Sequence, residues 1–295
     1  MKIFDMHVHA RNVAANPGKL LMELSLAGIH GACVFSNEPK EYSVLNGTDF
    51  DTRLAELHAW TSGYEERLFP VLWVHPYEDG ITEKVHQAAE RGVCAFKIIC
   101  NNFYVYEDKS MALVSEIAKL RKPVIFHTGI LWDGEVSSNY NRPLNWECML
   151  DIENLKFSMG HCSWPWHDEC IALYGKFLNS KSNGKSAEMF FDLTPGTPEI
   201  YREELFRKLL TIGYHVPNNI MFGTDCHADA YNVEWAKRWL SIDGELLDKF
   251  KATKLLKEKI YSQNLLRFLG KSGESIAEFK LNQDEQEMWR PELEI

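Results

Sequence analysis

The feature of this sequence that most constrains its fold is a set of polar residues at the downstream ends of short apolar runs. Each of them could bind a metal ion, and they are spread over most of the chain: His7, His9, His127, His161 and Asp225. The carboxyl ends of the strands in a closed parallel barrel converge on one rim, so residues far apart in sequence can meet there at one ion. The pattern therefore predicts a metal site assembled from distant strands.

Short runs rich in Val, Ile and Phe alternate with longer helical patterns along the whole chain. Eight runs are expected to be strands: residues 3–9, 31–36, 69–75, 93–100, 123–127, 156–161, 189–192 and 220–225. Continuous apolar character is typical of parallel strands covered by helices, because neither face meets water. Amphipathic segments that are long enough for crossover helices lie between them, for example at residues 82–91, 109–121, 199–213 and 233–241.

The repeat of strand, helix and parallel strand predicts an α/β fold, a (β/α)8 TIM barrel. An open doubly wound sheet uses the same local units, but the scattered candidate ligands favour the barrel. A chain of 295 residues with 45% hydrophobic content suits one large core, so residues 1–270 are predicted to form a single catalytic domain. Residues 271–295 lose periodicity and are expected to be an extension that packs on the barrel or on a partner subunit. Two long connections, residues 37–49 and 129–145, are expected to be substrate loops.

The charge and composition of the chain limit its partners. A net charge of −10 argues against binding to nucleic acid or to an anionic membrane, because a negative surface repels both. No apolar run approaches the ~20 residues that span a bilayer. Because the first expected strand begins almost at Met1, we expect no secretory leader. Seven scattered cysteines without a CxxC pair are expected to be reduced. We therefore expect a cytoplasmic protein that acts on a small molecule and could form a homo-oligomer.

Five short motifs occur in order along the chain. They are Asp-Met-His-Val-His at 5–9, Phe-His-Thr-Gly at 126–129, Gly-His-Cys at 160–162, Phe-Gly-Thr-Asp at 222–225 and Asn-Leu-Leu-Arg at 264–267. Residues two apart on a strand point the same way, so His7 and His9 can present both imidazoles to one point. Together the motifs resemble the amidohydrolase superfamily, and within it the single-metal branch known as the amidohydrolase-2 family.

The resemblance implies a role for each of the five polar residues. His7, His9, His127 and Asp225 would hold one divalent metal and leave a position open for water or a substrate oxygen. Zinc is the leading candidate for the ion, although manganese and iron accept similar ligands. Asp225 would also carry a proton to the leaving group, and His161 would polarise the substrate or activate water. A supporting role for His161 is the alternative.

Lys97, on the fourth expected strand, leaves the number of ions open. In other branches of the superfamily a carbamylated lysine at this place bridges two metals, and His127 and His161 would then bind the second ion. In the single-metal branch the lysine often stays unmodified and contacts a substrate anion. Trp132, Trp164 and Tyr104 follow predicted strands and could form aromatic walls around the substrate, although ordinary loop packing would account for them equally well.

The leading functional prediction is metal-dependent hydrolysis of a small carboxylic ester, lactone or amide-like substrate by metal-activated water. The same branch contains metal-dependent decarboxylases of aromatic or unsaturated carboxylic acids that use the same residues, so decarboxylation is the alternative. A barrel that binds a metal or ligand without turnover is a third interpretation, from another class.

Overall fold

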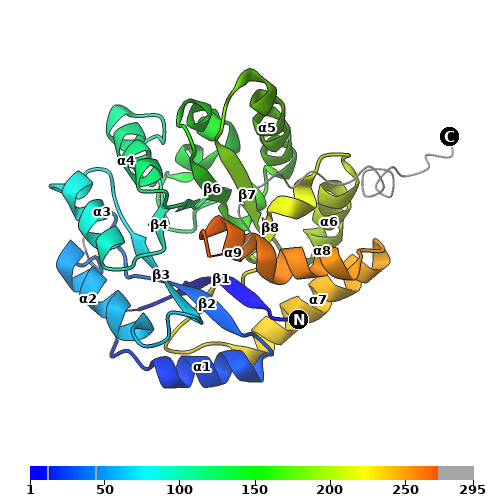
Figure 1. Cartoon of the computed structure of the whole chain (residues 1–295), viewed down its shortest axis with the longest axis horizontal. Helices are drawn as coiled ribbons and strands as arrows, with labels where there is room; N and C mark the ends of the chain where they lie inside the picture. The colour runs from blue at the N-terminus through cyan, green and yellow to red at the C-terminus, as the bar shows by residue number, and fades with distance from the viewer. Residues whose placement is uncertain (12, 44, 272–295) are drawn as a thin grey trace.

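The computed structural model describes residues 1–11, 13–43 and 45–271, and its described strands form one sheet that is parallel throughout (Figure 1). The strands are β1 (Phe4–His9), β2 (Gly31–Phe35), β3 (Leu68–Trp73), β4 (Ala95–Ile98), β5 (Val124–Phe126), β6 (Lys156–Met159), β7 (Glu188–Asp192), β8 (Ile220–Met221) and β9 (Cys226–His227). Their spatial order is β8-β7-β6-β5-β4-β3-β2-β1-β9, so strands that follow one another in sequence are neighbours up to β8.

The ends of the sheet join because β8 and β9 are two parts of one interrupted strand. β8 pairs with β7, while β9 pairs with β1 on the other side. Between them, the Met6 N–H donates to the Phe222 carbonyl oxygen over 2.9 Å. The chain therefore closes into the predicted (β/α)8 barrel, with β8 and β9 together in the place of the eighth strand.

Helices cover the outside of the barrel (Figure 1). The α-helices are α1 (Pro17–Leu26), α2 (Phe50–Thr61), α3 (Ile81–Glu90), α4 (Asp108–Lys119), α5 (His167–Ser180), α6 (Arg202–Thr211), α7 (Val233–Lys249), α8 (Lys254–Glu258) and α9 (Asn264–Phe268). Side-chain caps mark several starts: Asn16, Asp49 and Asn232 accept backbone N–H groups in the first turns of α1, α2 and α7. The expected loop at 129–145 contains one short 3₁₀ helix, Ser138–Asn141, and a second, Pro143–Asp151, begins there.

The inside of the barrel is filled with side chains. One buried cluster contains inward-facing residues of the strands, including Phe4, Phe69 and Phe190, together with Leu265 and Phe268 of α9. A larger cluster lies between the strands and the surrounding helices. Helix α9 thus packs against the amino-terminal end of the barrel interior, so a ligand has to enter at the carboxyl ends of the strands.

Three further expectations concern the cysteines, membrane-spanning segments and the carboxyl-terminal extension. All seven cysteines are free, as expected, and six of them are buried. No helix in the described part of the chain is long and apolar enough to cross a membrane. Of the expected extension at 271–295, all but Lys271 lies outside the described residues.

Candidate active site

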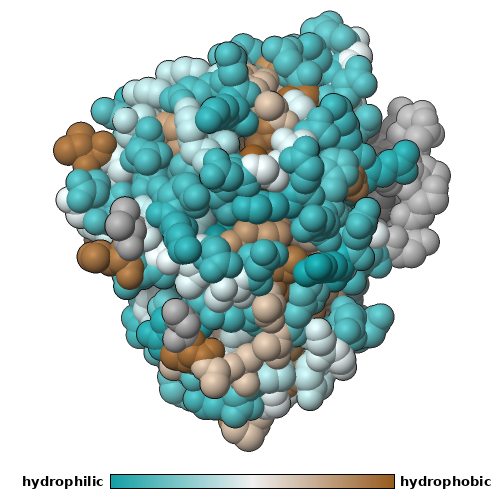
Figure 2. Space-filling model, turned by 90° about the vertical axis from the view of Figure 1, so that its left-hand side faces the viewer, coloured by the Kyte–Doolittle hydropathy of each residue, from teal (hydrophilic) through white to brown (hydrophobic). Residues whose placement is uncertain are grey.

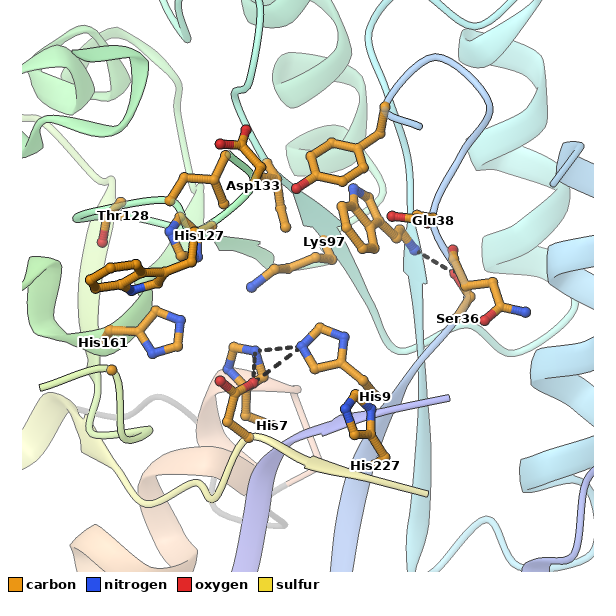
Figure 3. Close-up of a pocket in the computed structure, with 18 of the residues that line it drawn as sticks. His7, His9, Ser36, Glu38, Lys97, His127, Thr128, Asp133, His161 and His227 are labelled. Atoms are coloured by element: carbon orange, nitrogen blue, oxygen red, sulfur yellow. Dashed lines mark hydrogen bonds and ion pairs between the residues drawn. The ribbon is translucent and has the colours of Figure 1, made fainter. Parts of the chain in front are cut away.

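The carboxyl ends of the strands open into a pocket of about 800 Å³ (Figure 3). Eight of the nine residues that the sequence singled out line it: His7, His9, Lys97, His127, Trp132, His161, Trp164 and Asp225. They come from five different strands or the loops that follow them. The closed barrel therefore brings together residues that are more than two hundred positions apart in sequence, as the pattern predicted.

Three side chains in the pocket could hold a metal ion: His7, His9 and Asp225, whose ligand atoms all lie within 4.8 Å of one another. The two Nε2 atoms of the histidines are 3.1 Å apart. The Asp225 Oδ1 atom lies 3.6 Å from His7 Nε2 and 3.4 Å from His9 Nε2. Two imidazole nitrogens and a carboxylate oxygen that converge in this way form a donor set that suits a divalent transition metal.

The direction of the His7 ring is fixed by a buried carboxylate. Its Nδ1 lies 2.7 Å from Asp192 Oδ2, and both side chains are almost fully buried. Burial lowers the pKa of His7 to about 3, so the ring is neutral at neutral pH. With the proton on Nδ1 toward Asp192, the Nε2 lone pair faces His9 and Asp225. Asp192 is not among the residues predicted from the sequence, although its position as the last residue of the seventh expected strand is a usable signal.

Strand β1 has an irregularity where it delivers its histidines. Its register against β2 shifts between Asp5 and Val8, and a bulge of this kind re-aims side chains. Met6 belongs to the cluster inside the barrel, Val8 packs on the outer side, and His7 and His9 both reach the pocket. Because of this shift, one strand supplies first a side chain to the packed interior and then two histidines to the pocket.

Asp5 ties this part of β1 to the segment that carries Asp225. It accepts hydrogen bonds from the His7 N–H, the Thr224 N–H, the Thr224 hydroxyl and the Tyr231 hydroxyl. Burial raises the pKa of Asp5 to about 7, against the opposing effect of these bonds. Asp225 itself has a left-handed backbone with φ of 62°, and its N–H donates to the His7 carbonyl oxygen. Such a conformation is uncommon for a residue other than glycine and is often found at functional sites.

His127 faces the same pocket but lies outside the group of three. Its Nε2 is 3.2 Å from the Ile130 carbonyl oxygen, a contact that occupies this nitrogen as a donor and leaves Nδ1 as an acceptor. Its ring centroid is 5.0 Å from that of His161. Burial lowers the pKa of His127 well below its ordinary value, with help from His161 and Lys97. Three of the four predicted ligands therefore converge, and the fourth is a neutral imidazole nearby.

His161 is held by a strained turn and by its neighbours. It begins a run of three residues with positive φ, His161, Cys162 and Ser163, at 55°, 45° and 59°. The turn is supported by Thr128, whose hydroxyl donates to the Gly160 carbonyl and accepts from the Ser163 hydroxyl. His161 Nδ1 lies 3.2 Å from the Thr194 carbonyl oxygen, and its ring centroid is 5.5 Å from that of His7. The His161 ring therefore lies next to the three candidate metal ligands but is not one of them.

Lys97 extends its ammonium group into the pocket beside the histidines (Figure 3). The side chain is fully buried, and its Nζ makes no hydrogen bond with any residue that the structure describes. Burial lowers the pKa of Lys97 to about 8, although Asp192 and Asp225 oppose the shift. A buried cation without a hydrogen-bond partner is costly, and a substrate anion would satisfy it.

The predicted aromatic residues divide into two groups. Trp132 and Trp164 line the pocket with their rings stacked, 6.3 Å between centroids and 14° between planes. Tyr104 is not among the residues that line it. It stacks instead on Tyr106, with 4.9 Å between ring centroids, and contacts Tyr140 of the connection after β5.

Two further aromatic side chains that the sequence analysis did not select contribute to the wall: Trp73 and Tyr42, with ring centroids 4.7 Å apart. Tyr42 belongs to the expected substrate loop at 37–49. Trp73 lies within an expected strand, two residues before its end. Residue type alone does not single out Trp73. Its place near the carboxyl end of an expected strand is the signal that could have identified it.

Comparisons with known proteins agree with this geometry. The sequence matches the family described as Amidohydrolase over residues 4–271, and the chain therefore belongs to this amidohydrolase family, as the motifs indicated. A comparison with curated proteins found no match.

Several solved structures share the fold. The probable 2-pyrone-4,6-dicarboxylic acid hydrolase of Acinetobacter baumannii has a TM-score of 0.60 at 12% identity, covering 92% of this chain and 100% of the other. The 2,6-dihydroxybenzoate decarboxylase of Rhizobium has a TM-score of 0.60 at 10% identity, covering 92% and 99%. The dihydroorotase of Campylobacter jejuni has a TM-score of 0.57 at 15% identity, covering 93% and 85%. At these identities the likeness establishes the barrel and not the substrate.

Proposed function

We propose that the protein is a metal-dependent hydrolase that cleaves an ester, lactone or amide-like bond in a small carboxylated molecule. The convergence of His7 Nε2, His9 Nε2 and the Asp225 carboxylate at the open end of the barrel carries this proposal. The contact between His7 and Asp192 supports it, because it leaves a neutral, oriented nitrogen for a metal. His127 would be the fourth ligand through Nδ1. Imidazole and carboxylate ligands favour zinc, with manganese or iron as alternatives.

A bound divalent ion would supply Lewis-acid chemistry, polarising a substrate carbonyl group and making water nucleophilic. The residues of this chain would do the rest. Asp225, whose side chain is 37% exposed, is placed to accept a proton from water and deliver it to the leaving group. His161 would hydrogen-bond to the substrate oxygen on which charge develops. Lys97 would neutralise a carboxylate of the substrate, and the tryptophan pair would cover its apolar part.

Metal-dependent decarboxylation is the second candidate. It is favoured by one observation: the unpartnered Lys97 ammonium and the stacked Trp132 and Trp164 share the pocket, a combination that suits a carboxylated flat ring. Membership in the family is compatible with both reactions. The two differ in product, because hydrolysis places a solvent oxygen in the product and decarboxylation releases carbon dioxide.

The decisive experiment combines metal analysis with turnover. Protein purified without added metal is assayed for metal content and then screened with carboxylated lactones, esters, amides and aromatic acids in ¹⁸O-labelled water. We expect about one divalent ion per chain, loss of turnover on chelation, and one ¹⁸O atom in the product. Carbon dioxide release without ¹⁸O incorporation would establish the decarboxylase instead, and metal binding without turnover of any compound would contradict both reactions.

Replacement of the proton carrier gives the matched comparison. Asp225→Asn should lower kcat by about 10²–10⁴-fold, the usual contribution of a positioned acid or base. Asp248→Asn, on the outer face of α7 and paired with Lys257, should keep full activity. Normal turnover by a fully metallated Asp225→Asn protein would refute the role of Asp225.

A further inference from the structure

Residues 192–194, at the end of β7, contact two of the histidines in the pocket. The Asp192 carboxylate contacts His7 Nδ1 at 2.7 Å, and the Thr194 carbonyl oxygen lies 3.2 Å from His161 Nδ1. The two holders are also joined to each other, because the Thr194 N–H donates to Asp192 Oδ1 over 2.7 Å. The placement of residues 192–194 therefore sets the direction of both imidazole rings.

Leu193, the residue between Asp192 and Thr194, is held by a side chain from the helices outside the barrel. The Leu193 carbonyl oxygen accepts a hydrogen bond of 2.7 Å from Nη1 of Arg202, the first residue of α6. The other nitrogens of the same guanidinium donate to Asp243 of α7, with Nε at 2.8 Å from Oδ1 and Nη2 at 2.7 Å from Oδ2. Arg202 and Asp243 are each only 1% exposed. A planar guanidinium held at two points by a carboxylate has little freedom left, so the third contact is rigid.

Stability alone is a poor explanation for this ion pair. Two charges taken out of water lose solvation, and well-packed apolar residues of similar volume often give a fold equal or greater stability. The surroundings are suited to such residues, because the guanidinium carbon lies 4.9 Å from the ring centroid of Trp239 and 5.4 Å from that of Phe206. Apolar residues could not supply the fixed hydrogen-bond donor to the Leu193 carbonyl oxygen.

We propose that Arg202, oriented by Asp243, is a positioning residue for the metal centre. It fixes the Leu193 carbonyl, and through Asp192 and Thr194 it fixes the directions of His7 and His161. Helices α6 and α7 on the outside of the barrel thereby set the geometry of the pocket inside it. The inference rests on the proposed function in so far as His7 binds the ion.

The test measures metal affinity in a variant that keeps the packing. In full-length R202M/D243L the ion pair is replaced by apolar side chains of similar volume. We expect its dissociation constant for Co²⁺, measured by competition with a chelator, to rise about tenfold, the lower end of the effect of removing a group that orients a metal ligand. The visible absorption of bound Co²⁺ should change, and kcat should fall with little change in KM. The midpoint of thermal unfolding should stay within a few degrees of that of the unaltered protein.

A second buried pair offers the matched control. Arg53 and Glu78 form an ion pair whose side chains are at most 3% exposed, in which Arg53 Nη2 donates to both carboxylate oxygens. Arg53 Nε also donates to the Trp73 carbonyl oxygen. The pair touches no residue that holds His7 or His161. R53M/E78L should therefore leave the Co²⁺ affinity and spectrum as in the unaltered protein. An equal loss of affinity in both double variants would overturn the inference, because it would reveal a general effect of removing a buried pair.

Single variants cover the case in which R202M/D243L does not fold. Arg202→Lys keeps the positive charge but cannot contact Asp243 and Leu193 with a planar fork, so it should weaken Co²⁺ binding by about three- to tenfold. Asp243→Asn should weaken it less, because Arg202 can still reach Leu193. Unchanged affinity in Arg202→Lys would overturn the positioning role while leaving the proposed function intact. Failure of the unaltered protein to bind Co²⁺ would overturn both.

Discussion

Lys97 occupies a position that is costly for the fold. Its ammonium is fully buried and has no hydrogen-bond partner among the described residues. Burial lowers its pKa from the ordinary 10.5 to about 8. At about 1.4 kcal/mol per pKa unit, this corresponds to an unfavourable contribution of about 3 kcal/mol to folding near neutral pH. A group that destabilises the fold is readily explained when it serves ligand binding.

Replacement of Lys97 by Met should therefore separate stability from activity. Met fills a similar volume without the charge, so the free energy of unfolding of the metal-free protein should rise by about 1–3 kcal/mol. The KM for a carboxylated substrate should rise at least about tenfold, because a charge-assisted contact is lost. Urea denaturation at pH 7 and steady-state kinetics measure the two effects. Lys119→Met, on the exposed face of α4, should change stability by less than about 0.5 kcal/mol. A Lys97→Met protein that is less stable than the unaltered chain would contradict this account.

At this scale the sequence identified the candidate metal ligands and several other residues that line the pocket, but not the residues that hold them in place. His7, His9, His161 and Lys97 could be predicted because they end or occupy apolar runs and belong to motifs. Asp192 belongs to none of the motifs, and its place at the end of an expected strand is the one signal for it. Arg202 and Asp243 are charged residues in amphipathic helices, where a sequence pattern predicts solvent exposure rather than a buried pair.

At the scale of elements, irregular segments do most to shape the site. The expected strand at 220–225 is interrupted after Met221, and Asp225 takes a left-handed conformation just before β9 begins. Apolar periodicity reports which residues are buried but not the sign of φ, so this interruption could not be predicted. The turn after β6 is similar, with three non-glycine residues at positive φ. The regular strands and helices were predictable because their burial is continuous or periodic.

The turn after β6 also depends on a small residue in the segment that faces it. A Cβ atom on Gly196 would lie 2.7 Å from His161 Cγ and 2.8 Å from its Nδ1. Gly196→Ala should push the imidazole aside and lower kcat by about 100-fold, since misplacement by about 1 Å can have this effect. Gly18→Ala, on exposed α1, meets only ordinary contact and should keep normal kcat. Kinetics with a thermal unfolding control would test this, and a Gly196→Ala enzyme with normal kcat would show that His161 tolerates displacement.

For the whole molecule, buried neutral histidines make folding sensitive to acid. His75, just after β3, is 2% exposed, and burial lowers its pKa from 6.5 to about 4. Between these values the unfolded chain binds a proton that the folded chain does not. Stability from this group is therefore complete above about pH 6.5 and falls as the pH drops toward 4.

The contribution of His75 can be isolated by substitution. In the metal-free protein, the change in unfolding free energy between pH 7 and pH 5 should be smaller for His75→Gln than for the unaltered chain by about 1–2 kcal/mol. Urea denaturation at the two pH values measures it. The same loss in both proteins would mean that other groups dominate. His86→Gln, half-exposed beside Glu116, should retain the full acid sensitivity.

Closure of the amino-terminal end of the barrel by α9 also has a consequence for kinetics. Leu265 and Phe268 of α9 pack against the interior aromatic residues, so in the described part of the chain the pocket opens where the strands end. A molecule that has reacted must leave by the route through which the next one arrives. Product and substrate therefore compete for one passage, and the product that retains the carboxylate should inhibit competitively.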